Sequence, residues 1–173
     1  YKIASFEIVD IPLIKKVAAT GKPLIMSTGM SSLEEIGEAV EAAKSVGNEQ
    51  IILLKCTSTY PAPPDATHVS AVATLAKTFG VMAGLSDHTH GIGVALASIA
   101  FGARVIEKHF TLSRADGGVD SAFSLEPAEL KALVEESDRA WRSIGTPELG
   151  MRPAEEASLA FRRSLYIVRE VNV

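Results

Sequence analysis

The chain has 173 residues, of which 47% are hydrophobic and 22% charged, and its formal net charge at pH 7 is −4. This composition predicts a globular α/β domain and excludes a largely disordered chain. The apolar runs are about 4 to 8 residues long, too short to cross a bilayer. The acidic balance gives no electrostatic reason to expect nucleic-acid binding. A single cysteine, Cys56, excludes an internal disulfide and indicates a reducing, cytoplasmic location.

Apolar segments alternate with helical patterns at a spacing of roughly 25 residues, and this alternation is typical of a parallel sheet. Most of the apolar segments are continuous, as expected for strands covered on both faces. In chain order, the predicted strands are Tyr1–Ser5, Pro23–Thr28, Ile51–Thr57, Val81–Ser86 and Ala103–Phe110. The predicted helices that follow them are Ile11–Ala19, Leu33–Val46, Thr67–Phe79, Ile92–Phe101 and Pro127–Ile144.

Local signals support the helix boundaries. Ser32 and Glu35 have the spacing of a capping box at the start of the second helix, and Gly47 follows its end. In the last helix, four apolar residues recur near helical spacing and are expected to pack against the sheet. They are Leu130, Leu133, Val134 and Trp141.

Every predicted strand ends in polar or small residues. A doubly wound sheet concentrates function at one crevice, whereas a (β/α)₈ TIM barrel places function at the carboxyl end of every strand. The pattern therefore favours an α/β TIM barrel represented by about its last five β/α units, with about three units upstream of Tyr1. Residues 1–150 are predicted to be the C-terminal portion of the barrel domain. Residues 151–173 are predicted to be a barrel-end segment and linker, with a strand at Leu165–Arg169.

His88 and His109 come at the ends of two successive predicted strands. If these strands are neighbours, their ends lie about 4.8 Å apart and both imidazoles can reach one ion. Only two nitrogen ligands are visible, and such an open site suits Mn²⁺ or Mg²⁺ better than structural zinc. The alternative is that each imidazole forms an ordinary loop hydrogen bond. Asp87 and Thr89 flank His88, where they either fix its orientation or form a turn.

Hydroxyl groups recur at matching strand ends. Lys2 and Ser5 come at the end of the first predicted strand, and Ser27, Ser58 and Ser86 follow at later ones. A lysine with a ring of hydroxyls can hold a phosphate or a carboxylate. The alternative for Lys2 is a solvated side chain near the start of the chain.

Two loops offer further candidates beside these strand ends. Tyr60 lies in a proline-rich loop whose prolines either shape a site or only orient the next helix. Gly117 and Gly118 precede Asp120, and they either let the loop close over a ligand or provide ordinary flexibility. Cys56 lies inside an apolar run and is expected to pack in the core.

Five motifs resemble the sialic acid synthase family in their order and spacing. They are Tyr1–Glu7 (YKIASFE), Ser27–Met30 (STGM), Cys56–Pro61 (CTSTYP), Gly84–Thr89 (GLSDHT) and Ile106–Thr111 (IEKHFT). Two further stretches, Arg114–Pro127 and Phe161–Tyr166, are most similar to the pseudaminic acid synthase branch. The resemblance covers almost the whole chain and corresponds to the central-to-C-terminal part of the barrel.

The resemblance implies a metal-dependent condensation of phosphoenolpyruvate with an acylated amino sugar, here a 2,4-diacetamido-2,4,6-trideoxy hexose. The products would be phosphate and a nine-carbon keto sugar, pseudaminic acid. His88 and His109 would bind Mn²⁺ or Mg²⁺, and the catalytic residues would be Glu7, Tyr60 and Asp120. The phosphoenolpyruvate site would contain Lys2, Ser5, Ser27, Ser58 and Ser86. The family also implies a homodimer with a C-terminal antifreeze-like domain, so we expect the 173-residue chain alone to be inactive.

Other functions are compatible with the same residues. Within the family, the alternatives are N-acetylneuraminate synthase, legionaminate synthase and a spore-coat polysaccharide synthase. A different metal-dependent barrel enzyme, such as an aldolase, would predict a Schiff-base lysine at Lys55 or Lys108. Alternation along the strand weakens this alternative, because it points Lys108 away from the side that His109 faces. The non-enzymatic alternative is a sugar-binding or assembly module.

Overall fold

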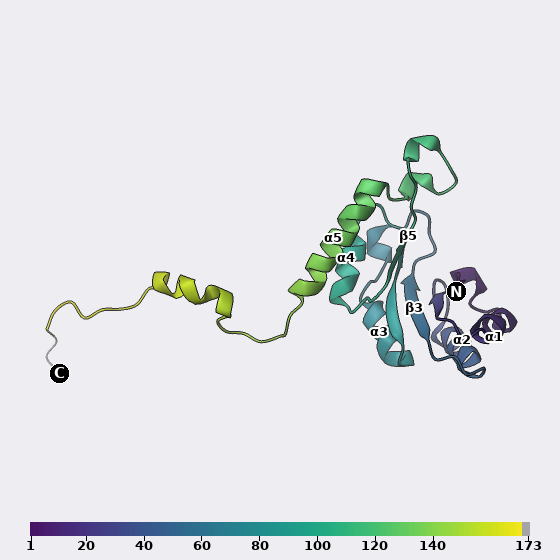
Figure 1. The fold of residues 1–173 in the computed structure, drawn as a ribbon, viewed down its shortest axis with the longest axis horizontal. Helices are drawn as coiled ribbons and strands as arrows, with labels where there is room; N and C mark the ends of the chain where they lie inside the picture. Colours follow the sequence, from purple (N-terminus) through teal and green to yellow (C-terminus); the bar gives the residue numbers. More distant parts are fainter. Residues whose placement is uncertain (171–173) are drawn as a thin grey trace.

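The computed structural model describes residues 1–170, and its main body is a parallel sheet flanked by helices (Figure 1). The five strands pair in chain order, and every pair is parallel. They are β1 (Lys2–Ile3), β2 (Leu24–Ser27), β3 (Ile51–Cys56), β4 (Met82–Asp87) and β5 (Ile106–Lys108). Strands that pair in chain order and alternate with helices are the repeating unit of a (β/α)₈ barrel. The predicted α/β barrel fold is confirmed as a half-barrel of five such units.

A helix follows each strand, although the connections also contain short 3-10 turns. The helices are α1 (Ile11–Ala18), α2 (Leu33–Lys44), α3 (Ala71–Phe79), α4 (Gly93–Ala100) and α5 (Pro127–Ser143). The predicted capping box of α2 is confirmed. The Ser32 hydroxyl accepts from the Glu35 amide at 3.2 Å, and the Glu35 carboxylate accepts from the Ser32 amide at 2.8 Å. Gly47, after this helix, has a φ of +84°, in the left-handed region that favours glycine.

Several predicted boundaries are wrong at the edges of the sheet. The edge strands β1 and β5 are shorter than expected, because each has a hydrogen-bonding neighbour on one side only. Helix α3 begins at Ala71 instead of Thr67, since the chain first turns at His68 with a φ of +44°. Val134 and Trp141 of α5 are 63% and 44% exposed instead of packed, because α5 packs against α4 beside the edge strand β5.

Most of the core lies between the sheet and α1 to α3. Its fully buried members include Ile14, Leu24, Met26, Leu53 and Val72. Burial of such side chains is the main favourable contribution to folding, at about 1.5–3 kcal/mol for each one. A smaller cluster, formed by Ala95, Leu125 and Leu133, joins α4, α5 and the loop after β5.

The sheet is strongly curved. Lys2 lies on β1 and Glu107 on β5, which are the two opposite edges of the sheet. Even so, the Lys2 Nζ and Glu107 Oε1 atoms are 3.6 Å apart. Curvature of this kind is typical of a barrel wall, and it gathers the carboxyl ends of all five strands around one space.

Residues 145–170 differ from the main body because every one of them is exposed. They contain a 3-10 helix at Pro153–Phe161 and extend away from the half-barrel in Figure 1. The predicted strand at Leu165–Arg169 is not formed, since no other strand lies beside these exposed residues to pair with them. The last residues of the predicted linker, 171–173, lie outside the described part. Within residues 1–170, no helix is long and apolar enough to cross a membrane.

Candidate functional site

Two histidine rings lie next to each other, edge to face, at the carboxyl ends of β4 and β5. His88 and His109 each come directly after their strand, and the centres of their rings are 5.2 Å apart. The two strands are neighbours, with Asp87 paired to Lys108 in the ladder. Because side chains alternate along a strand, both histidines extend to the side opposite this pair. The predicted adjacency of the two histidines is confirmed.

The two rings differ in what holds their Nδ1 atoms. The Nδ1 atom of His88 is 2.9 Å from the Thr57 carbonyl oxygen, and a carbonyl can only accept. His88 therefore carries its proton on Nδ1, and Nε2 keeps a free lone pair. The Nδ1 atom of His109 is 3.6 Å from the Asp120 carboxylate, which is too long for a hydrogen bond but leaves this side of the ring facing a negative charge. Of the two alternatives for Asp87 and Thr89, the structure shows the turn: the Thr89 amide donates to Asp87 Oδ1 at 2.9 Å, and the His88 ring itself is bonded to the Thr57 carbonyl instead.

The surroundings of the two rings shift their protonation in opposite directions. Burial and the neighbouring charge of His88 lower the pKa of His109. Burial alone would also lower the pKa of His88, but its contacts with Cys56 and the Thr57 carbonyl outweigh burial and raise it. Cys56 is buried at the end of β3, as predicted, with its Sγ 3.9 Å from the His88 ring. Burial would raise the pKa of this thiol, but hydrogen bonds with His88, Ser5 and Ser58 lower it to about 7.

Two aromatic residues enclose the histidines. The Tyr60 ring is 4.2 Å from His88, and the Phe123 ring is 5.0 Å from His109. The two aromatic rings are themselves 6.0 Å apart, so all four rings form one cluster. Burial, followed by the negative groups nearby, raises the pKa of Tyr60. Tyr60 was predicted from the sequence, whereas Phe123 was missed, because an aromatic residue in a loop carries no distinctive sequence signal.

The predicted serines gather around the ends of β1 to β4. Ser5 lies in the 3-10 turn after β1, and its Oγ accepts from the Gly29 amide at 3.0 Å. Ser27 ends β2, and its buried hydroxyl has no hydrogen-bond partner within residues 1–170. A Cβ on Gly29 would collide with the Ser58 Oγ and lie 2.8 Å from the Ser5 Oγ. The glycine therefore keeps this hydroxyl-lined space open, and the unpartnered Ser27 hydroxyl suits a polar ligand there.

A carboxylate that sequence reasoning did not assign to the site joins its two sides. Glu107 accepts a hydrogen bond from the Ser86 hydroxyl at 2.7 Å and lies 3.6 Å from Lys2 Nζ. Alternation could have found it, because Glu107 precedes His109 by two residues and so shares its face of the sheet. Glu7 lies in the turn after β1, where its exposed carboxylate accepts from the Ala4 amide at 2.8 Å.

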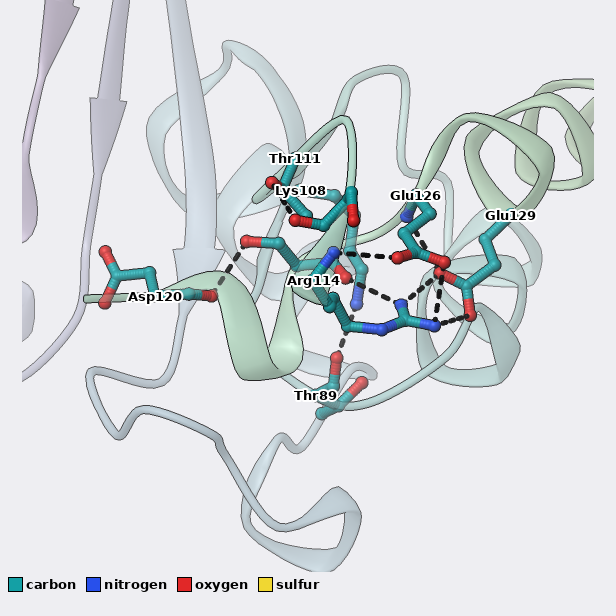
Figure 2. Close-up of polar contacts among 9 residues, drawn as sticks. Thr89, Lys108, Thr111, Arg114, Asp120, Glu126 and Glu129 are labelled. Carbon is teal, nitrogen blue, oxygen red and sulfur yellow. Dashed lines mark hydrogen bonds and ion pairs between the residues drawn. The ribbon is translucent and has the colours of Figure 1, made fainter. Parts of the chain in front are cut away.

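The loop between β5 and α5 is tied down at both ends (Figure 2). At its base, the Leu125 amide donates to the His109 carbonyl at 2.8 Å and the Thr111 amide donates to the Leu125 carbonyl at 2.9 Å. Figure 2 shows the Arg114 guanidinium beside the Glu126 and Glu129 carboxylates, to which it is bonded or ion-paired. These ties hold the loop closed and present Asp120 to His109.

The donors would form an open metal site instead of a closed one. Within residues 1–170, no cluster of three or more His, Cys, Asp or Glu side chains converges on one point. The two imidazoles would supply two nitrogen ligands, and the remaining positions would be open to water or substrate oxygens. Structural zinc sites are fully enclosed by four protein ligands, and this site is not.

Comparison with known proteins gives one consistent result. The NeuB family model matches residues 1–148. A pseudaminic acid synthase from Helicobacter pylori is 39% identical over 172 residues, covering 99% of this chain and 51% of that protein. An N,N'-diacetyllegionaminic acid synthase from Campylobacter jejuni is 40% identical over 172 residues, covering 98% of this chain and 50% of that protein.

Structural comparison agrees with the sequence comparison. The crystal structure of an N-acetylneuraminic acid synthetase from Leptospira borgpetersenii, in complex with citrate, superimposes with a TM-score of 0.84 at 38% identity. The superposition covers 95% of this chain and 57% of that one. The chain spans about half the length of the curated relatives it matches. With its family model, its relatives and its fold in agreement, the chain belongs to the NeuB family.

Proposed function

We propose that the protein provides the metal site and the phosphoenolpyruvate site of an enzyme that condenses phosphoenolpyruvate with an acylated amino sugar. The products are phosphate and a nine-carbon keto sugar. The observation that carries the proposal is the pair of imidazoles, with ring centres 5.2 Å apart, beside a group of strand-end serines. This group includes a buried hydroxyl that has no hydrogen-bond partner within residues 1–170. The family membership and the synthase names of its relatives support the same chemistry.

The binding roles follow from the chemistry of each side chain. Lys2 and the hydroxyls of Ser5, Ser27, Ser58 and Ser86 hold the phosphate and carboxylate groups of phosphoenolpyruvate. A positive charge with several hydroxyl donors suits a doubly anionic ligand. Glu107, beside Lys2 and Ser86, keeps the lysine directed into this space.

The metal proposal rests on the two adjacent imidazoles and on the free Nε2 atom of His88. His88 and His109 hold Mn²⁺ or Mg²⁺, which when bound polarises the sugar aldehyde as a Lewis acid. Asp120 places a negative charge beside Nδ1 of His109, and Tyr60 forms the wall beside His88. Glu7 is our candidate for assisting proton transfer, because its carboxylate is exposed in the turn after β1.

The finer parts of the proposal concern the sugar and the cellular setting. The motif resemblance to the pseudaminic branch favours a 2,4-diacetamido-2,4,6-trideoxy hexose. The named relatives support legionaminate and pseudaminate synthesis alike, at 40% and 39% identity. We also propose a homodimer, as the resemblance implies, and a cytoplasmic location, which the single unpaired thiol supports.

The experiment is phosphate release from phosphoenolpyruvate by the full-length protein with Mn²⁺. It is run with the diacetamido hexose of each branch and with N-acetylmannosamine, and a His88→Ala/His109→Ala variant serves as control. We expect release with one of the diacetamido sugars and none from the variant. Release with none of the sugars would contradict the proposed function.

A further inference from the structure

The structure contains a buried ion pair that the proposed reaction does not use. Lys108 Nζ lies 3.0 Å from Asp87 Oδ2, and the two side chains are 3% and 0% exposed. The same ammonium group donates to the Thr89 carbonyl at 2.6 Å, as Figure 2 shows. A lysine held in this way has no access to a carbonyl substrate. These contacts count against a Schiff-base role for Lys108.

The pair spans the two strands that carry the histidines. Asp87 and Lys108 are direct partners in the β4–β5 ladder, one residue before His88 and His109 respectively. Because side chains alternate along strands, the ion pair and the two imidazoles lie on opposite faces of the sheet. The ion pair on one face therefore constrains the two imidazoles on the other face, because each histidine is only one residue further along its strand.

Hydrogen bonds from the pair also fix the chain on both sides of His88. One carboxylate oxygen of Asp87 binds Lys108, and the other accepts from the Thr89 amide at 2.9 Å. The Lys108 ammonium holds the Thr89 carbonyl at the same time. The backbone at residues 87 and 89 is thus held, and the direction in which the His88 side chain leaves the chain is determined.

The pairing of β4 with β5 alone would fix the directions of the histidine side chains only weakly. β4 and β5 are joined by only three residue pairs, from Leu85 with Ile106 to Asp87 with Lys108. A slip of one residue would turn every side chain of β5 to the other face. Removing two charges from water is costly, so a buried ion pair is weak evidence for stability and is better explained by specificity.

We propose that Asp87 and Lys108 form a positioning pair that holds the His88 and His109 rings next to each other across the β4–β5 junction. The pair touches neither substrate nor metal and acts through the two strands. Its importance for catalysis rests on the proposed function, but the geometry that it controls exists without any metal. The two ideas can therefore fail separately.

The test is an apolar replacement of the whole pair, Asp87→Leu/Lys108→Met, in the full chain. Contacts between the His88 and His109 ring protons are measured by NMR without metal, and amide exchange in β2 and β3 reports whether the sheet is intact. The control replaces an exposed pair on α5, Glu136→Leu/Arg139→Met. We expect a folded double variant that has lost the contacts between the two rings, while the control keeps them.

A metal titration extends the test. We expect the same double variant to bind Mn²⁺ about 10–100-fold more weakly, which is the usual effect of losing groups that support metal ligands. A folded double variant with unchanged ring contacts would overturn the proposal. If the wild type binds no Mn²⁺ but loses its ring contacts on substitution, the proposed function fails and the positioning role stands.

A measurement on the wild type decides the case if the double variant does not fold. Hydrogen exchange of the Lys108 ammonium is followed by NMR, with exposed Lys77 as the reference. We expect the Lys108 ammonium protons to exchange slowly enough to be observed while those of Lys77 are not. Equally fast exchange of both would show that the pair does not hold in solution and would overturn the proposal.

Discussion

The two sides of the site are built in different ways. On the side of β1 to β3, serine hydroxyls line the space, and each lies at a strand end or in a short turn. On the side of β4 and β5, two imidazoles depend on a buried ion pair, an aromatic cluster and a tied loop. A serine hydroxyl is placed almost entirely by its backbone, whereas an imidazole has two torsion angles to fix. The histidine side therefore needs more supporting residues than the hydroxyl side.

The largest effect on stability is expected from removing one partner of the buried ion pair that supports the histidine side. Lys108→Met leaves the buried Asp87 carboxylate without its positively charged partner, so we expect the free energy of unfolding to fall by about 3–5 kcal/mol. Urea unfolding monitored by circular dichroism measures the change. The control is Lys77→Met on the exposed face of α3, where we expect a change within about 0.5 kcal/mol. Equal effects at both lysines would contradict the supporting role of the buried ion pair on the histidine side.

A smaller effect is expected from the hydroxyl side, where only backbone space is needed. Gly29→Ala pushes the Ser5 and Ser58 hydroxyls aside and breaks the hydrogen bond from the Gly29 amide, at a cost of about 1 kcal/mol. We also expect phosphoenolpyruvate to bind more weakly to the full-length protein, as measured by calorimetry.

The matched control for this variant is Gly37→Ala within α2. A Cβ there would lie 3.7 Å from the Phe79 ring, which is ordinary van der Waals contact. Alanine is the better helix former, so we expect this control to gain about 0.5–1 kcal/mol. Unchanged phosphoenolpyruvate binding in the Gly29→Ala variant would show that the hydroxyls at this position do not hold the ligand.

A local effect is expected from releasing the loop beside His109. Arg114→Met removes the bonds to Glu129 and to the Ser124 carbonyl, so amide exchange should become faster in residues 111–125 and stay unchanged in the strands. Arg139→Met removes an exposed ion pair on the same helix as Glu129 and should leave the loop as it is. If both variants behave alike, the ties drawn in Figure 2 do not order the loop.

The smallest effect is expected on the pKa of His109 when the neighbouring Asp120 is neutralised. The negative charge of Asp120 opposes the lowering of the His109 pKa, so Asp120→Asn should lower this pKa further. Because the pKa of His109 is below its usual value of 6.5 in the folded state, its contribution to stability is present above pH 6.5 and is lost as the pH falls. The Asp120→Asn variant should therefore lose more stability than the wild type as the pH falls. An NMR titration of the His109 ring measures the shift, and a higher pKa in the variant would contradict this account.

The sequence was sufficient to predict the features that depend on periodicity and residue type. Parallel strands, the helix caps and the pairing of His88 with His109 all follow from such local patterns. Other features depend on where side chains point in three dimensions. The packing of Phe123 on His109 and the approach of Lys2 to Glu107 join residues 14 and 105 positions apart, counted from their numbers. No local pattern indicates them.

The errors have a similar cause. Val134 and Trp141 fit the apolar stripe of a helix, but no further element covers that part of α5 in the described structure. Leu165 and its neighbours have the composition of a strand, but a strand also needs a partner, and none lies beside them in residues 1–170. Propensity shows what a segment can form, and its neighbours decide whether it does.

The most direct measurement is Mn²⁺ binding by the full-length protein, followed by electron paramagnetic resonance of the free ion. If the two adjacent imidazoles form one metal site, the wild type binds one Mn²⁺ per chain and His88→Ala/His109→Ala binds none at the same concentrations. The exposed His68 provides the control, and His68→Ala should bind Mn²⁺ like the wild type. Equal Mn²⁺ binding by the double variant and the wild type would contradict the central claim that His88 and His109 hold the metal.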